Sequence, residues 1–132
     1  MRLFYAGFLA VLILPVPGLR ADDPVPEPTQ RTDAPFRLFR TQNIYTFLKL
    51  DTRTGQVWQL QWGIDESHRF IEAISVTALA EGKQAGRFTL YPSSNIFTFV
   101  LLDQEDGRQW QIQWGERGRR LIVPIGQAQT SK

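Results

Sequence analysis

Cysteine is absent from all 132 residues. This absence excludes disulfide bonds, a thiolate nucleophile and a cysteine zinc site, so the hydrophobic core alone must stabilise the fold. Histidine is nearly absent too, because His68 is the only one and it lies in the loop-like stretch DESHR. A metal site would therefore need oxygen ligands, and residues 103–106 (DQED) offer them for Ca²⁺. The matching residues 51–54 lack these acids, and we expect neither a metal nor a cofactor.

The chain also lacks an excess of one charge once its N-terminus is set apart. Residues 1–21 combine a basic start, an apolar run over residues 3–14 and the helix-breaking stretch PVPGLRA, which is typical of a signal peptide. As a helix the run would span about 18 Å, too short for a membrane anchor. Its removal leaves 13 Lys and Arg against 13 Asp and Glu, which argues against nucleic acid as a partner. We expect an exported protein, periplasmic or extracellular, without a stable membrane span.

Proline and polar residues mark the borders of a single domain. Residues 22–35 contain four prolines and almost no large apolar side chain, which predicts a flexible linker. Residues 127–132 form a polar tail. The folded domain is therefore expected over residues 36–126.

This domain contains an internal duplication. Residues 36–63 align with residues 88–115 without a gap, and 14 of the 28 pairs are identical. We infer two repeats, residues 36–79 and 87–126, and we expect that neither buries its apolar face alone.

Each repeat reads as short strands separated by turns. Apolar and polar residues alternate with a period of two, and Gly55 and Gly107 supply the positive φ of a tight hairpin. Asp51 and Asp103 can bond amides in these turns, and Pro124 predicts that the last strand lies at an edge. The pattern predicts an all-β protein of two tandem antiparallel β-meander repeats, packed as a small sandwich or flattened barrel with pseudo-twofold symmetry.

The candidate contact residues are the tryptophans and glutamines that alternate on the third strand of each repeat: Trp58, Trp62, Trp110, Trp114, Gln59, Gln61, Gln111 and Gln113. We favour an interpretation in which the four tryptophans form the core between the sheets. The alternative is an exposed aromatic platform that stacks a sugar or another flat ligand. The glutamine rows are expected on the solvated face, where they could also line a groove.

Other patterns carry weaker hypotheses. Asp51 and Asp103 are related by the duplication, as in aspartic proteases, but the Asp-Thr-Gly sequence of that class is missing. The stretch LDTRTGQVW is similar to propeller repeats, although two copies cannot close a ring. The basic residues 117–120 (RGRR) are expected in a solvated turn. We therefore expect no catalytic residue.

The second copy, RFTLYPSSNIFTFVLLDQEDGRQWQIQWG, carries the most specific motif of the chain. It resembles small exported bacterial proteins of uncharacterised function with a doubled LLDxxxGxxWQxQW repeat. The first copy departs from this pattern at Arg40, where the pattern has proline. The resemblance implies export and no particular activity.

Two classes of function remain open from the sequence. We favour an exported, non-enzymatic binding module of the bacterial envelope, with an unknown protein or glycan as partner. The alternatives are a small hydrolase of glycan or peptidoglycan, disfavoured for want of an acid, base and nucleophile, and a glycan binder that uses exposed tryptophans. A structural role is a third possibility, in which edge strands pair with neighbours in a weak homo-oligomer.

Overall fold

The computed structural model describes Gly18 and residues 29–126. The predicted signal peptide, apart from Gly18, lies outside the described residues, as do the first part of the predicted linker and the predicted tail.

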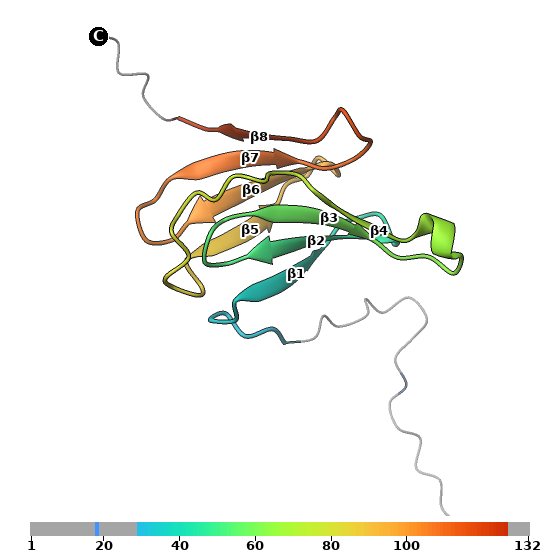
Figure 1. The fold of residues 1–132 in the computed structure, drawn as a ribbon, viewed down its shortest axis with the longest axis horizontal. Coiled ribbons are helices and arrows are strands. Elements are labelled where there is room, and N and C mark those ends of the chain that lie inside the picture. Colours follow the sequence, from blue (N-terminus) through green and yellow to red (C-terminus); the bar gives the residue numbers. More distant parts are fainter. Residues whose placement is uncertain (1–17, 19–28, 127–132) are drawn as a thin grey trace, which may run out of the picture.

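The described chain forms two four-stranded antiparallel sheets, one from each repeat (Figure 1). The first sheet consists of β1 (Phe36–Arg40), β2 (Thr46–Asp51), β3 (Val57–Gln61) and β4 (Phe70–Ala73). The second sheet consists of β5 (Phe88–Pro92), β6 (Thr98–Asp103), β7 (Gln109–Gln113) and β8 (Leu121–Pro124). In each sheet the strands follow one another in chain order. The predicted fold class is confirmed, and the two sheets are not closed into a barrel.

The turns repeat the same local chemistry in both sheets. The side chain of Asn43 accepts a hydrogen bond from the amide of Tyr45 at 2.9 Å, and Asn95 accepts one from Phe97 at 2.9 Å. Gly55 and Gly107 have φ of 78° and 79°, as the hairpins require. Strand register is conserved as well, and β8, which contains Pro124, is an edge strand as predicted.

The connection between the repeats, residues 74–87, contains no helix. It is tied to the first sheet by a hydrogen bond from the amide of Leu79 to the carbonyl of Thr54 at 2.7 Å. The end of the predicted linker is also attached, because Gln30 exchanges two hydrogen bonds with the backbone of Leu38. One short 3₁₀ helix, η1 (Glu66–His68), precedes β4.

The two faces of each sheet differ in character, and we name them by their residues. The front face of a sheet carries its two tryptophans with the neighbouring large apolar side chains. The back face carries its glutamines. In the first sheet the front face comprises Phe36, Leu38, Phe47, Trp58, Leu60 and Trp62, and its equivalent in the second comprises Phe88, Leu90, Phe99, Trp110, Ile112 and Trp114.

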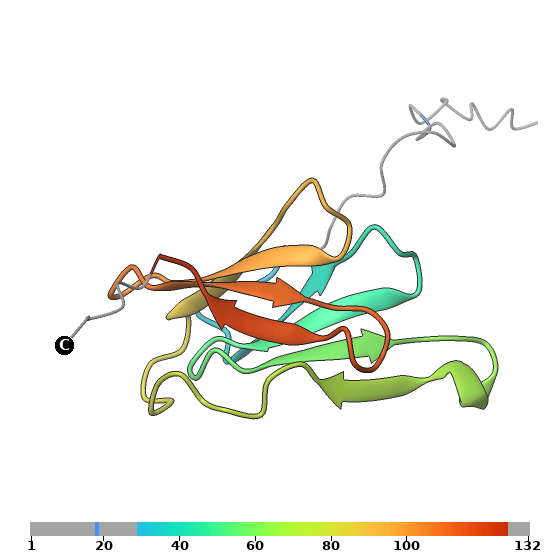
Figure 2. The ribbon, with the colours of Figure 1, turned by 90° about the horizontal axis from the view of Figure 1, so that it is seen from above.

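The core lies where the back face of the first sheet meets the front face of the second. Leu48, Leu50 and Val57 belong to the first of these surfaces and are fully buried. The six front-face residues of the second sheet are at most 4% exposed. In Figure 2 the second meander, in yellow to red, lies in front of part of the first, in blue to green. The sheets therefore stack front to back.

This stacking corrects one expectation. The pseudo-twofold relation does not extend to the faces, because equivalent faces of the two repeats do not meet. The prediction that all four tryptophans form the core is right for Trp110 and Trp114, which are 4% exposed. It is wrong for Trp58 and Trp62, because among residues 29–126 no sheet covers the front face of the first repeat, and Trp62 stays 45% exposed.

Candidate functional site

The predicted contact residues are distributed over three surfaces. Trp58 and Trp62 lie on the open front face of the first sheet, whereas Trp110 and Trp114 lie in the core. Gln59 is buried at the interface between the sheets. The remaining glutamines are partly exposed: Gln61 on the back of the first sheet, and Gln111 and Gln113 on the open back of the second. The exposed tryptophans and most of the glutamines therefore do not form one site.

The second tryptophan of each repeat, Trp62 or Trp114, is held by a hairpin of its own sheet in the same way. The indole N–H of Trp62 donates to the carbonyl of Ile44 at 2.9 Å, and that of Trp114 donates to Ile96 at 2.9 Å. The ring of Trp62 also lies 5.2 Å from that of Tyr45. The hairpin thus sets the direction of the indole, and only the covering sheet decides its exposure.

The open front face of the first sheet is aromatic but carries cations. The ammonium of Lys49 lies 4.8 Å from the ring of Phe36 and 5.4 Å from that of Trp58. The guanidinium of Arg53 lies 5.1 Å from the Phe36 ring on the same side. These cation–π contacts keep charge on a surface of otherwise large apolar side chains. Such a surface is suited to contact a partner that offers both apolar and polar groups.

A depression of about 340 Å³ adjoins this face beside Trp62. Its lining residues are Tyr45, Gln61, Trp62, Gly63, Ile64, Asp65 and His68. His68 is the exposed last residue of η1, and its Nδ1 is 3.9 Å from a carboxylate oxygen of Asp65. The depression thus combines aromatic rings with hydrogen-bonding groups, which are the components of a small ligand site.

A polar cluster at the interface was not anticipated from the sequence. The side-chain oxygen of Gln59 accepts hydrogen bonds from the amide of Gly115 and from Nε of Arg120, both at 2.9 Å. Arg120 also bonds Glu72, which Arg117 reaches at 3.0 Å. Hydrogen bonds from Arg117 and Arg120 lower the pKa of Glu72. The basic turn is therefore not wholly solvated, since the Arg120 side chain is only 11% exposed.

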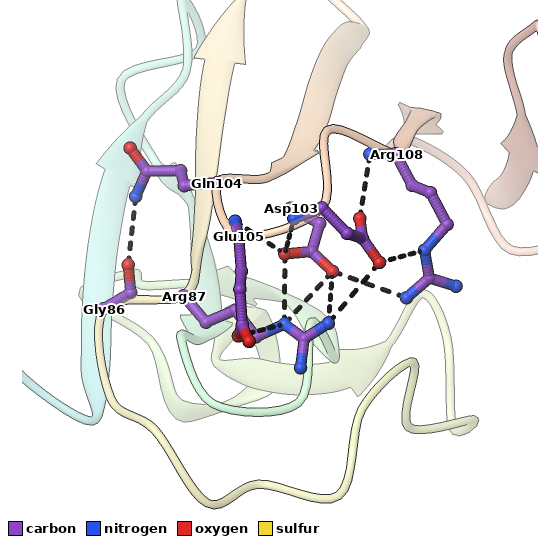
Figure 3. Close-up of polar contacts among 7 residues, drawn as sticks. Gly86, Arg87, Asp103, Gln104, Glu105 and Arg108 are labelled. Atoms are coloured by element: carbon purple, nitrogen blue, oxygen red, sulfur yellow. Dashed lines mark hydrogen bonds and ion pairs between the residues drawn. The ribbon is translucent and has the colours of Figure 1, made fainter.

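Asp103 has the most deeply buried charged side chain among residues 29–126, and arginines surround it (Figure 3). Its carboxylate is fully buried and accepts hydrogen bonds from Arg87 at 2.8 to 3.1 Å and from the amide of Glu105 at 3.0 Å. Arg108 lies 3.4 Å away. Burial alone would raise the pKa of Asp103, but the hydrogen bonds from Arg87 and from the amides of Glu105 and Asp106 lower it to about 2.

Asp51 is the equivalent of Asp103 and also serves its own hairpin. Its carboxylate accepts hydrogen bonds from the amide of Arg53 at 2.9 Å and from the guanidinium of Arg53 at 3.0 Å. Both aspartates thus bond turn amides, as the sequence predicts, and both are paired with arginine. Neither resembles the proton-sharing pair of an aspartic protease.

The comparisons add no relative. No protein-family model, no curated protein and no solved structure matches the chain. Among the described residues, no three or more His, Asp or Glu side chains are placed to hold a metal ion. Within the same part of the chain, no helix has the length and hydropathy needed to cross a bilayer.

Two positions in the sequence distinguish the open face from its covered equivalent. Lys49 stands where the second repeat has the buried Leu101, and Val57 is buried where the second repeat has Gln109. The first repeat is therefore the more polar of the two on its front face and the more apolar on its back face. Together these two differences mark the front of the first sheet as exposed and its back as covered.

Proposed function

We propose that the protein is an exported, non-enzymatic binding module of the bacterial envelope, and that its contact surface is the front face of the first sheet. The observation that carries this proposal is the difference between Trp62, 45% exposed, and its equivalent Trp114, 4% exposed. The front face of the second sheet is covered, whereas the equivalent side chains of the first sheet are open. Large exposed apolar faces are characteristic of contact sites.

The dimensions of the face favour a protein partner. Its side chains come from all four strands of the first sheet, since Ile71 of β4, 51% exposed, continues the surface beside Leu60. A single sugar ring would cover only one or two of these positions. A broad surface with central aromatic residues and a surrounding polar rim is typical of protein interfaces.

A glycan partner is the second candidate, and one observation favours it. The depression beside Trp62 places Tyr45 and Trp62 next to Gln61, Asp65 and His68. Aromatic rings can stack on a sugar while such polar groups bond its hydroxyls. This candidate needs Trp62 and its depression rather than the whole front face.

Catalysis receives no support from the charged groups. The buried carboxylates of Asp51 and Asp103 are occupied by arginines and turn amides, and the pKa of Asp103 is lowered. A general acid would need a raised pKa and access to substrate. We therefore propose binding without chemistry.

The test compares variants that change the front face with one that does not. Leu38→Glu/Ile71→Glu alters two residues of the face, which are 43% and 51% exposed, and leaves the core intact. Val76→Glu alters a residue in the inter-repeat connection, 79% exposed, and serves as the matched control.

Binding is measured as retention of envelope proteins and of peptidoglycan fragments on the immobilised protein. We expect the wild type and the control to retain proteins, and the front-face variant to lose at least about tenfold. Equal retention by all three proteins would contradict the proposal. Retention of peptidoglycan that Trp62→Ala abolishes would favour the glycan candidate, and release of soluble fragments would indicate a hydrolase.

A further inference from the structure

Within residues 29–126, two faces stay open that match the two faces already in contact inside the molecule. These are the front of the first sheet and the back of the second. We propose that the front face of the first sheet of one copy docks on the back face of the second sheet of another copy, which repeats the internal sheet-to-sheet interface between molecules. This inference rests on the proposed function and names the partner as a second copy of the chain.

The apolar side chains of the two open faces correspond to those of the buried interface. On the front, Trp58, Leu60 and Trp62 correspond to Trp110, Ile112 and Trp114. On the back, Val100 and Leu102 correspond to Leu48 and Leu50, and both are partly exposed. Their aromatic neighbour Tyr91, 52% exposed, corresponds to Phe39. A shape that packs once within the chain is thus presented again on its surface.

The polar contact at the centre of the internal interface has its components in place as well. Inside the molecule, Gln59 accepts from Gly115 and Arg120, and Arg120 is oriented by the carbonyl of Gly115 at 3.0 Å.

The open faces carry the equivalents of these three residues: Gln111, Gly63 and Arg69. Nε of Arg69 donates to the carbonyl of Gly63 at 2.8 Å, which orients this guanidinium in the same way as that of Arg120. Within residues 29–126, the amide of Gly63 and the side chain of Gln111 form no hydrogen bond. Docking would join them as Gly115 and Gln59 are joined.

Three substitutions make the external contact weaker than the internal one. Lys49 replaces the buried Leu101, and Gln109 replaces the buried Val57. Val123 replaces Glu72, so the ion pairs with Arg117 and Arg120 have no counterpart. The Lys49 stem can stay along the aromatic rings while its ammonium reaches the rim. We expect reversible association, with a Kd of about 10 to 100 µM.

The geometry makes the assembly open-ended. The two docking surfaces are different and lie on different sheets, so the contact is heterologous. A pair of molecules still presents one free front and one free back, and growth continues until a ring closes or a filament forms. Such growth differs from a symmetric dimer, which would stop at two copies.

Sedimentation velocity of the purified protein from about 10 µM to 1 mM tests the inference with paired variants. The front variant is Leu38→Glu/Ile71→Glu. The back variant is Tyr91→Glu/Val123→Glu, whose two positions are 52% and 41% exposed, and Val76→Glu is the control. Circular dichroism and urea unfolding check that each variant is folded, and single substitutions Ile71→Lys and Val123→Lys replace any double variant that is not.

We expect the average mass of the wild type and the control to rise steadily with concentration, while the front and back variants each stay monomeric. An equimolar mixture of the two variants should form a dimer and nothing larger, because one supplies an intact front and the other an intact back. A wild type that is monomeric at about 1 mM, or a mixture that stays monomeric, would overturn the inference. So would association of the back variant alone, which indicates front-to-front pairing. In each of these cases the retention experiment above still tests the proposed function separately.

Discussion

Trp62 and Trp114 lie in equivalent hairpins with equivalent ring neighbours and equivalent indole hydrogen bonds, yet one is exposed and the other is buried. Each indole donates a hydrogen bond to an isoleucine carbonyl at 2.9 Å. Trp62 packs on the ring of Tyr45, and Trp114 packs on the ring of Phe97. Trp62 is 45% exposed and Trp114 is 4% exposed. A difference in the free energy of unfolding between variants at the two positions therefore measures what coverage by the other sheet contributes.

Trp114→Ala should lower the free energy of unfolding by about 3 to 5 kcal/mol, because it opens a cavity in the core. Trp62→Ala should cost about 1 kcal/mol, since much of its surface is already in water and its hydrogen bond is exposed. Urea unfolding followed by circular dichroism measures both. Equal losses would mean that Trp62 is as well covered as Trp114.

Asp51 and Asp103 are also equivalent residues of the two repeats, and the burial of their arginine partners differs. The side chain of Arg87 beside Asp103 is 21% exposed, whereas that of Arg53 beside Asp51 is 36% exposed. Asp103→Asn leaves Arg87 without its buried counter-charge and should cost about 3 kcal/mol. Asp51→Asn should cost about 1 kcal/mol, because Asn can still accept the turn amide and Arg53 is better solvated. Urea unfolding at pH 7 that ranks the two variants the other way would contradict this reasoning.

The Asp103 cluster also predicts a dependence of stability on acid. The pKa of Asp103 is lowered in the folded protein to about 2 from 3.8, so its carboxylate stabilises the fold fully above about pH 5. That contribution, about 2 kcal/mol, is lost as the pH falls through 4 to 2. The wild type and Asp103→Asn should therefore converge in stability over this range. A constant difference from pH 6 to pH 2 would exclude the lowered pKa.

The hairpins that contain Gly55 and Gly107 have the same local structure but different surroundings. Gly55 and Gly107 share a positive φ, but a Cβ at Gly107 would meet nothing within 4 Å. A Cβ at Gly55 would lie 3.0 Å from the ring of Phe88 and 3.1 Å from Leu79. The first hairpin is thus packed against the second repeat at Gly55, whereas Gly107 of the second hairpin is exposed.

Gly107→Ala should cost about 1 kcal/mol, the strain of a left-handed alanine. Gly55→Ala carries the same strain and in addition pushes into Phe88 in the core, so we expect a total loss of about 2 to 4 kcal/mol. Thermal and urea unfolding of the two single variants measure the difference. If both variants lose the same amount, the first hairpin is not in contact with the second repeat.

At the level of the whole chain, the second repeat depends on the first for its cover. Its front-face side chains are at most 4% exposed in the complete protein and would all face water in the separated repeat. The polar contacts Gln59–Gly115 and Glu72–Arg120 also join the two repeats. The two sheets should therefore unfold together.

Neither repeat should fold alone. Fragments of residues 22–82 and 83–132 are expected to give no cooperative thermal transition by circular dichroism, whereas the whole protein shows one transition. The second fragment should aggregate or bind hydrophobic dyes more strongly, because its front face carries Trp110, Trp114 and Phe99. A fragment of residues 22–82 that melts cooperatively would contradict this dependence.

Much of the fold could be predicted because its causes are local. Alternation within each strand, the asparagine and aspartate turns and the positive φ of Gly55 and Gly107 act over a few residues, and the duplication shows each pattern twice. The short strands of the two meanders and the edge position of Pro124 follow from these patterns. The candidate tryptophans and glutamines were also recognisable, since strict alternation separates them onto two faces.

The choice of contacting faces depended on the tertiary structure. Both faces of each sheet carry apolar side chains, so local pattern alone permits front-to-front and front-to-back stacking. The observed stacking is selected by contacts between residues more than 40 positions apart, including Gln59 with Gly115 and Glu72 with Arg120. Lys49 disfavours burial of this face inside the chain, because burying its charge without a partner would cost several kcal/mol. Side-chain periodicity thus defines two faces for each sheet, and packing energy between the distant repeats decides which face of the first sheet remains open.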